Sequence, residues 1–535
     1  RDAVVRICRL VEGLPLGIEL AAAWVHVLSC QEIANEIAQT IDFLSSNRRD
    51  VPLRHRSIRA AIDHSWALLT TTEQRVLQHL AIFRGGFTRD AAQAVAQATL
   101  PRLTALLDKS LVQRVGDNRY DLHELVRQYA AAQLATMEQR AEATPATAQP
   151  TAAQSHARYY VELAEAARRH WHGPEQTAWA EQLQQELDNL RAAQAWMVAG
   201  GDLALAPRLA NALWRFWEMR GYVTEGRRWI GAVLTVCEVH SQAPEVQPVR
   251  TQLLHVAGLL ARIQGDFVQA QHYHLQSLAL RRQQGDQAGV AAALIGLGNV
   301  AMFMGDYAAA EAYFQENLEI HRQQNDTRHI YITYNNLAIV AMYQGNYTRA
   351  QELHETVLAY HRQQGALDGI ASALGNLGDV FRCQGKYLEA ERALQESLTL
   401  FDQLQNVQGK VVTLNSLGRV ALAVGQIAEA INHFAASLRL YAVASDKIAL
   451  LDNLEGMAQV ATRNQHDARA ITLYGAATTL RHTLHIPLPA IDQRAQEESL
   501  TQLRTNVALD TFATAWSQGQ SLTLEQAIAY ALTGA

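Results

Sequence analysis

Residues 294–310, which read LIGLGNVAMFMGDYAAA, decide the architecture because their landmarks recur every 40 residues along the chain. The glycine of the GD pair is one of five glycines at that interval, which are Gly265, Gly305, Gly345, Gly385 and Gly425. Each is followed two residues later by an aromatic or aliphatic residue, and three residues after that by an alanine. Ala470 marks a sixth copy, whose turn has lost the glycine. A fixed period of this length is typical of a repeat architecture.

Each repeat is predicted to be a helical hairpin. The apolar stripe of the first helix ends at Gly305, where glycine can take the left-handed conformation that stops a helix, and a second helix is expected from 307 to about 324. Small residues such as Gly298 let the two backbones approach, and bulky ones such as Phe314 fill the remaining space. One hairpin cannot bury its apolar stripe alone. Six in series are therefore predicted to stack into a right-handed α-α superhelix with a continuous core.

Over residues 251–485 the pattern resembles the tetratricopeptide family, in the longer version seen in kinesin light chains and many bacterial signalling ATPases. The first helix of each hairpin lines the inner surface of such a superhelix, which implies a protein or peptide ligand there. Asparagine can donate to and accept from an extended peptide backbone, and aromatic residues supply apolar area. By register, the expected partner-binding residues are Asn299, Phe303, Asn336, Tyr343, Asn376, Asp379, Arg382 and Arg419.

The chain outside the six repeats divides by composition. Residues 141–154 contain Ala, Thr, Pro and Gln without a large apolar residue, so they are predicted to be a linker. Residues 155–250 are rich in tryptophan and are interpreted as irregular helical hairpins that open the solenoid, with the tryptophans as packing residues. Residues 486–535 depart from the period and are expected to form capping helices.

Residues 51–140 are predicted to form a winged helix. Four helices are expected at 57–69, from a cap at Thr72 through 80, after Thr88, and at 103–109; a small β-hairpin at 111–122 and a helix from Glu124 follow. The helix that begins at Arg89 is the candidate DNA-recognition helix. It is nearly neutral, so its attraction for phosphate should be weak.

Four motifs in the first 140 residues resemble the signal-transduction ATPases with numerous domains (STAND), whose NB-ARC module occurs in bacterial regulators and in plant disease-resistance proteins. They are GLPL at 13–16, RHRSIRAAI at 54–62, FRGGF at 83–87 and LDKSLV at 107–112. The resemblance implies that residues 1–50 are the remnant of the NB-ARC helical subdomain. It also implies that Pro15 packs against adenine. Leu122-His123-Glu124 matches the family's Met-His-Asp motif, so His123 would contact the β-phosphate of ADP in the resting state.

The chain itself lacks the motifs of a nucleotide hydrolase. Its Gly-Lys pairs, at 385–386 and 409–410, have no glycine five positions before them, so neither is a phosphate-binding loop. No HExxH or Gly-x-Ser-x-Gly motif occurs. We expect no enzyme activity and no cofactor in this chain. ADP or ATP with Mg²⁺ is implied for a parent protein whose NTPase domain precedes Arg1 and contacts this portion.

No metal site is expected either. His272 and His274 lie two apart on a helix and make a poor ligand pair. The 20 histidines are interpreted as mostly surface residues, with the periodic His321 and His361 belonging to the repeat.

Charge and cysteine content narrow the remaining classes. Lys and Arg number 46 against 52 Asp and Glu, a net charge of -6 that is too mild to imply a polyanionic partner for the whole chain. The four cysteines have no CxxC spacing and fit a reducing, cytoplasmic compartment, and no apolar run is long enough for a membrane span. The favoured function is a sensor portion that binds a ligand through the repeats and relays it through the winged helix, with ligand-induced oligomerisation of the parent. The alternative is a transcription regulator that binds DNA through the winged helix.

Overall fold

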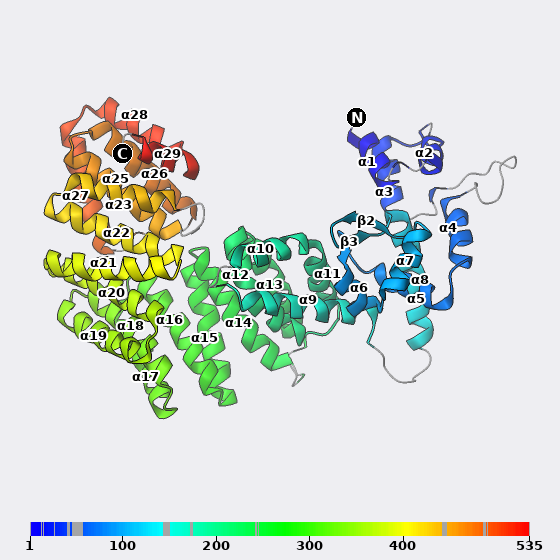
Figure 1. Ribbon diagram of the computed structural model, residues 1–535, viewed down its shortest axis with the longest axis horizontal. Helices are drawn as coiled ribbons and strands as arrows, with labels where there is room; N and C mark the ends of the chain where they lie inside the picture. Colours follow the sequence, from blue (N-terminus) through cyan, green and yellow to red (C-terminus); the bar gives the residue numbers. More distant parts are fainter. Residues whose placement is uncertain are drawn as a thin grey trace. The chain divides into compact units, whose positions relative to one another are not determined.

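The computed structural model describes residues 2–11, 13, 15–25, 27–39, 43–44, 57–142, 150–171, 175–240, 243, 246–440, 447–484, 488 and 490–533. The chain divides into two compact units, residues 1–216 with 229–249, and residues 217–228 with 250–535. Helices make up nearly all of both units (Figure 1). Most of the predicted linker, at 143–149, and the arginines at 48, 49, 54 and 56 lie outside the described residues.

The first unit begins with three short helices and continues into the predicted winged helix. Its elements are α1 (Asp2–Leu10), α2 (Pro15–Ala22), α3 (Cys30–Gln39), α4 (Ile58–Ala67), α5 (Thr71–Leu80), β1 (Phe87–Thr88), α6 (Arg89–Ala96), α7 (Leu100–Asp108), β2 (Gln113–Gly116), β3 (Arg119–Asp121), α8 (Glu124–Glu142), α9 (Ala152–Arg168), α10 (Gln176–Gln185) and α11 (Leu187–Val198). Three further helices, α12 (Leu205–Arg220), α13 (Val223–Val239) and α14 (Val246–Ile263), contain residues of both units.

The winged helix is confirmed, with three differences in detail. The β-hairpin gains a third strand, because β1 pairs with β3 and the sheet order is β1-β3-β2. The cap of α5 is Thr70 rather than Thr72: Thr70 and Glu73 form a reciprocal capping box, which satisfies two amides that the helix leaves unpaired. Finally, the helix that directly precedes the β2–β3 hairpin is α7. That is the recognition position of a winged helix, so its assignment to the helix beginning at Arg89 was wrong.

The first three helices and the winged helix share a hydrophobic core. Leu125 and Tyr129 of α8 are buried together with residues of α1, α2 and α3, including Ile7, Leu20 and Ile33. The region that carries the GLPL motif is thus packed against the end of the winged helix.

The second unit is built of the predicted hairpins and their capping helices. Its elements after α14 are α15 (Phe267–Gln284), α16 (Gln287–Phe303), α17 (Tyr307–Gln323), α18 (Thr327–Tyr343), α19 (Tyr347–Gln364), α20 (Leu367–Cys383), α21 (Tyr387–Gln403), α22 (Val407–Val424), α23 (Ile427–Arg439), α25 (Lys447–Arg463), α26 (Asp467–Leu484), α27 (Ala490–Asn506), α28 (Leu509–Gln520) and α29 (Leu524–Leu532). From α15 to α26 each helix packs against the next one in the chain, and α22 also packs against the first helices of both adjacent hairpins, α20 and α25.

The turn glycines behave as the period predicts. Gly265, Gly305, Gly345, Gly385 and Gly425 have φ between 74° and 84°, a region that side chains with a Cβ rarely adopt. In the sixth copy Gln465 takes this conformation at φ 61°.

Close approach of the helices also follows the prediction. A Cβ added at Gly298 would lie 2.5 Å from the Phe314 ring, so only glycine leaves room for that ring. In two repeats a histidine fills the place of Phe314, because His274 and His354 stand 40 residues before and after it. Both are buried. With His156 and His321 also buried, the expectation of mostly surface histidines fails at these positions.

Candidate functional site

The eight predicted partner-binding residues lie on four successive first helices of the repeats, α16, α18, α20 and α22. All eight are half-buried, so each side chain is accessible on one side while the opposite face of its helix packs in the core. We call them the first-helix row.

The aromatic members of the first-helix row stack on the aromatic residue of the preceding turn. The rings of Phe303 and Phe267 lie 5.5 Å apart at 6°, and those of Tyr343 and Tyr307 lie 5.6 Å apart at 5°. The guanidinium of Arg262 lies 5.6 Å from the Phe303 ring centre, within cation-π range. Phe303 and Tyr343 therefore stabilise the packing of their own repeats as well as offering apolar surface.

The charged members of the row are engaged with one another and with the next repeat. Asp379 accepts a hydrogen bond from the Ser416 hydroxyl at 3.1 Å and lies 3.6 Å from Nε of Arg382. Nη2 of Arg419 lies 3.8 Å from a carboxylate oxygen of Asp452.

The amide members differ among themselves. Asn376 donates to Oδ1 of Asn335 at 2.8 Å, which links α20 to α18. The side chains of Asn299 and Asn336 make no hydrogen bond to any described residue. These two amides are the members of the row whose donors and acceptors remain available to a ligand.

A buried ion pair outside the first-helix row lies near the end of the repeats. Arg481 donates to both carboxylate oxygens of Glu455, at 2.6 and 3.0 Å, and to Asp452 at 2.6 Å. Burial raises the pKa of Glu455, although its hydrogen bond to Arg481 opposes that shift. Because Asp452 also faces Arg419, the charges form one chain across α22, α25 and α26.

Pro15 and His123, the two residues expected to face a nucleotide, each lie at the start of a helix. Pro15 is the first residue of α2, a favourable position because proline has no amide hydrogen to leave unpaired. His123 precedes α8, and its Nδ1 accepts a hydrogen bond from the backbone amide of Leu125 at 3.2 Å, as a helix cap does. The sequence contains no phosphate-binding loop to accompany these two residues.

A polar junction between the winged helix and α9–α11 was missing from the sequence-based prediction. Asn189 of α11 is fully buried; its Oδ1 accepts from the backbone amide of Arg84 at 2.7 Å, and its Nδ2 donates to the carbonyl of Gly86 at 2.9 Å. Nδ2 also donates to Glu186 at 2.8 Å. Glu186 in turn pairs with Arg119 of β3 at 2.5 Å. We call Arg84, Gly86, Arg119, Glu186 and Asn189 the junction.

Aromatic residues pack beside the buried part of the junction. The Phe83 ring meets those of His156 and Tyr160, with centres 5.3 and 6.3 Å away, and the Tyr160 hydroxyl donates to Glu186 at 2.8 Å. Burial lowers the pKa of His156 to about 4. Burial, followed by the Glu186 carboxylate, raises the pKa of Tyr160. The FRGGF motif is therefore the segment by which the winged helix contacts α9 and α11.

The recognition helix α7 presents few groups that could read DNA bases. Thr104 and Asp108 are exposed, whereas Nζ of Lys109, which follows the helix, pairs with Glu73 of α5 at 2.7 Å, and the guanidinium of Arg102 donates to the carbonyl of Gln97 at 2.8 Å. In the wing, Arg114 pairs with Asp117 at 3.2 Å.

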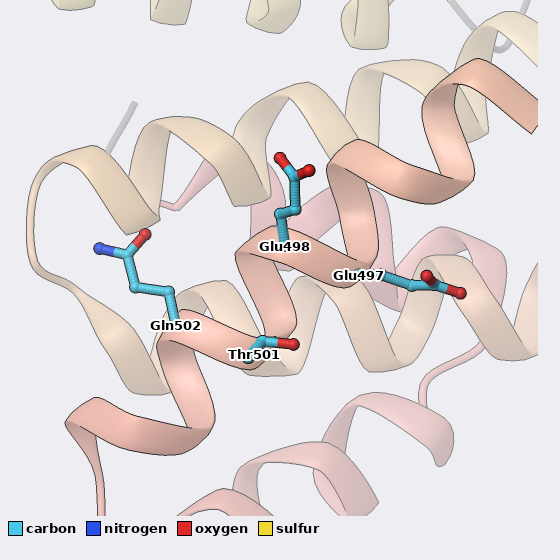
Figure 2. Close-up of a pocket in the computed structure, with 4 residues that line it drawn as sticks. All are labelled: Glu497, Glu498, Thr501 and Gln502. Carbon is cyan, nitrogen blue, oxygen red and sulfur yellow. The ribbon is translucent and has the colours of Figure 1, made fainter.

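Shallow depressions occur on the surface of the repeats and of the helices that follow them. One lies along α27, where Glu497, Glu498, Thr501 and Gln502 point outward (Figure 2). Another lies on α18 and α19 and includes the stacked rings of Tyr331 and Tyr360, 3.9 Å apart. No helix in the described ranges is both long and apolar enough to cross a membrane.

Protein-family models match two parts of the chain, in agreement with the fold described above. A tetratricopeptide repeat model matches residues 250–323 and 329–403, and a winged helix-turn-helix domain model matches residues 69–135. The chain carries tetratricopeptide repeats and a winged-helix domain.

Among curated relatives, a Mycobacterium tuberculosis protein named "Putative HTH-type transcriptional regulator" is 35% identical over 312 residues, which cover 55% of this chain and 34% of the relative. An uncharacterized protein of the same organism is 37% identical over 140 residues, 24% of this chain and 35% of the relative. The chain thus spans about a third of the length of the curated relatives that it matches.

Two solved structures are similar at low identity. A Pyrococcus horikoshii STAND protein with a tetratricopeptide repeat sensor is 12% identical, with 91% of this chain and 74% of that chain covered and a TM-score of 0.38. NprR in complex with its cognate peptide NprX is 14% identical, with 67% and 99% covered and a TM-score of 0.42.

Proposed function

We propose that this chain is the sensor and protein-interaction portion of a signalling switch. In this proposal the repeats bind a protein or peptide segment along the first-helix row, and the winged helix passes the event on. The observation that carries the proposal is the pair of half-buried amides, Asn299 and Asn336, that no described residue satisfies.

The chemistry of the row favours an extended peptide. A carboxamide offers two donors and an acceptor, which matches the alternating groups of a peptide backbone. Stacked rings at Phe303 and Tyr343 lie on the same two helices and would cover apolar ligand side chains. The internally paired Asp379, Arg382 and Arg419 would instead set charge preference toward the later repeats.

The junction supports a relay between the first solenoid helices and the winged helix. Because Asn189 and Glu186 are buried and hydrogen-bonded to backbone and side chains of the winged helix, movement of α11 would displace the turn at Gly86. A satisfied buried network has few alternative geometries, which suits it to transmit a rigid-body change.

The receiver of the relay is proposed to be an NTPase domain of the NB-ARC type. In that arrangement Pro15 and His123 would face ADP or ATP with Mg²⁺ held by that domain, and the present chain would hydrolyse no nucleotide alone. Cytoplasmic location and oligomerisation on ligand binding belong to the same proposal. Phosphate release by the purified chain at the rate of a P-loop ATPase would contradict it.

The binding test uses a phage-displayed library of random 12-residue peptides selected on the intact chain. Selected peptides should bind the Asn299→Ala/Asn336→Ala variant at least about tenfold more weakly, because two hydrogen bonds of about 1 kcal/mol each are lost. Gln283→Ala, on the exposed part of the second helix α15, is the matched control and should bind as wild type does. Equal affinity for all three proteins would show that the first-helix row is not the binding surface.

DNA binding is the second candidate, and the position of α7 before the wing favours it. Exposed Thr104 and Arg114 of the wing, whose side chain is 62% exposed, would supply the contacts. Fluorescence anisotropy with mixed-sequence duplex DNA at low and physiological salt tests this candidate. Binding that persists at physiological salt and is abolished by Arg114→Glu would favour it over a relay-only role.

A further inference from the structure

The exit of the second helix in each repeat has a recurring construction in the described residues. A large side chain near the end of that helix, Arg281, His361 or Phe401, lies over a glycine of the next helix, Gly289, Gly369 or Gly409. A Cβ on any of these glycines would lie 1.7–2.5 Å from the covering side chain. Glycine is therefore the residue that this packing requires.

One repeat breaks the rule. Position 329, which corresponds to Gly289, Gly369 and Gly409, is a histidine, and it faces the covering residue His321. The two imidazole rings lie 4.8 Å apart at 15°. A second difference accompanies it: in the preceding repeat Arg281 pairs with Asp286 at 2.9 Å, whereas Asp326, the counterpart of Asp286, has two imidazoles in place of the guanidinium.

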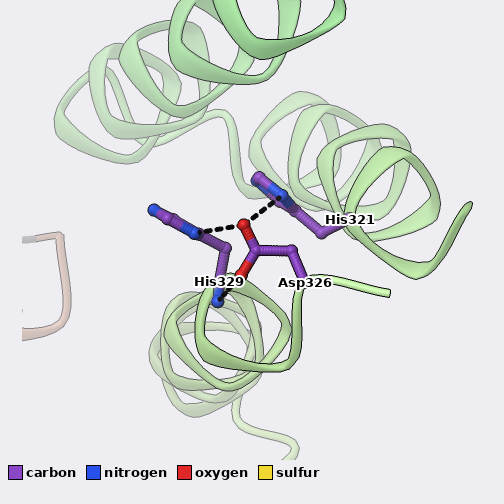
Figure 3. Close-up of side chains that lie close together, drawn as sticks. All are labelled: His321, Asp326 and His329. Carbon is purple, nitrogen blue, oxygen red and sulfur yellow. Dashed lines mark hydrogen bonds and ion pairs between the residues drawn. The ribbon is translucent and has the colours of Figure 1, made fainter. Parts of the chain in front are cut away.

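The three side chains converge on one point between α17 and α18 (Figure 3). Oδ2 of Asp326 lies 2.7 Å from Nδ1 of His329 and 3.8 Å from Nδ1 of His321, and all three atoms lie within 4.8 Å of one another. His321 is only 6% exposed, and its Nδ1 has no hydrogen-bond partner among the described residues. A buried imidazole nitrogen without a hydrogen-bond partner calls for an explanation, and here the nitrogen lies beside a carboxylate and a second imidazole.

We propose that His321, Asp326 and His329 bind a divalent transition-metal ion, with Zn²⁺ as the best match. Two imidazole nitrogens and one carboxylate oxygen are a ligand set for Zn²⁺ and its first-row neighbours, whereas Ca²⁺ and Mg²⁺ prefer oxygen alone. The ion would supply the positive charge that Arg281 supplies to Asp286 one repeat earlier.

The geometry needs only a local adjustment to accept the ion. Metal–ligand distances of about 2.0–2.1 Å in a tetrahedron place ligand atoms about 3.3 Å apart. The 3.8 Å separation must shorten and the 2.7 Å separation must lengthen, and His329, whose side chain is 44% exposed, is free to tilt. The proton that Nδ1 of His329 donates to Asp326 would move to Nε2 through solvent, so that Nδ1 presents its lone pair to the metal.

Two of the proposed ligands can be replaced by residues that stand at the equivalent positions of other repeats. His329→Gly restores the residue of three other repeats, and Asp326→Asn copies Asn406, which caps its helix as Asp326 does. The control is His361→Phe in the next repeat, where Ala366 and Gly369 stand at the other two positions and no ligand set exists. These choices keep the fold, which circular dichroism would verify.

The test is titration of the untagged, chelator-treated full chain with ZnCl₂ by calorimetry, and with CoCl₂ by visible absorption. Wild type and His361→Phe should bind one ion at a tightest site that gives the Co²⁺ bands of nitrogen and oxygen ligands. His329→Gly and Asp326→Asn should lose at least about 100-fold in affinity at that site, the upper range for loss of an outer-shell partner. An unchanged tightest site in His329→Gly, or a loss of the same size in His361→Phe, would overturn the proposal. This outcome is independent of peptide binding by the first-helix row.

Discussion

Replacement of Asn189 by alanine isolates the junction on which the proposed relay depends. The side chain is fully buried and accepts from the Arg84 amide at 2.7 Å while it donates to the Gly86 carbonyl at 2.9 Å. In Asn189→Ala both backbone groups lose their partner, whereas Glu186 keeps Arg119 and Tyr160. A buried polar group left unsatisfied costs about 1–3 kcal/mol, so we expect the junction to be weakened by about 2–4 kcal/mol.

Hydrogen exchange of the intact chain measures this loss where it occurs. A cost of about 2–4 kcal/mol corresponds to exchange about 30- to 700-fold faster at the turn around Gly86. The neighbouring Asp188→Ala removes an exposed ion pair with Arg191 at 3.2 Å and a carboxylate beside Gly85, but no buried hydrogen bond, so it should change exchange much less. Asn189→Asp keeps the acceptor but places a carboxylate 2.8 Å from Glu186, so it should be worse than alanine at neutral pH and recover on acidification. If Asn189→Ala and Asp188→Ala exchange alike, the junction does not hold α11 to the winged helix.

Three further predictions concern the repeats and their end. Burial lowers the pKa of His274 from an ordinary 6.5 to about 3, so the stability that its neutral form contributes is complete above about pH 6.5 and is lost as pH falls, by up to about 1.4 kcal/mol per pH unit. His274→Phe should flatten the acid side of the urea-midpoint profile, and the exposed His272→Phe should not. Gly298→Ala should destabilise by about 1–3 kcal/mol in urea unfolding because its Cβ would meet Phe314, whereas Gly231→Ala, in a helix with open space, should be neutral or stabilising. Arg481→Met should cost about 3–5 kcal/mol at pH 7 because Glu455 stays buried without its cation, and a shift to pH 5 should reduce that cost if Glu455 is then protonated; no reduction at pH 5 would mean that water or another cation replaces Arg481.

The sequence predicts the local structure of the repeats well because each repeat is decided by local constraints. Gly305 and its equivalents stop helices by their own backbone freedom, and Gly298 is required by the Phe314 ring on the other helix of the same hairpin. The wing was predictable for the same reason, since a polar turn joins two short apolar segments. The third strand was not, because β1 finds its partner Tyr120 more than thirty residues later.

Long-range polar contacts account for what the sequence did not reveal. Asn189 and Gly86 are about a hundred residues apart, and a buried asparagine has no composition signal that separates it from a surface one. The buried histidines could have been predicted by aligning the repeats. Positions 274 and 354 are equivalent to Phe314 and Phe434, and large apolar residues at the equivalent positions indicate burial. The same alignment would have identified His329, because the equivalent residues at 289, 369 and 409 are all glycine. In the first-helix row, register placed the residues, but only coordinates separate the free Asn336 from the engaged Asn376.

The packing of each hairpin only against its neighbours has a consequence for how substitutions combine. From α16 to α22 the extensive helix contacts lie within a repeat or between adjacent repeats, so free-energy changes in distant repeats should add, and those in adjacent repeats should couple. A ligand held between α16 and α18 would therefore influence α22 mainly through α20, where Asn376 and Asp379 already connect the helices on either side. The central repeats, and not the terminal ones, would then determine how far along the array the structural effect of a bound ligand extends.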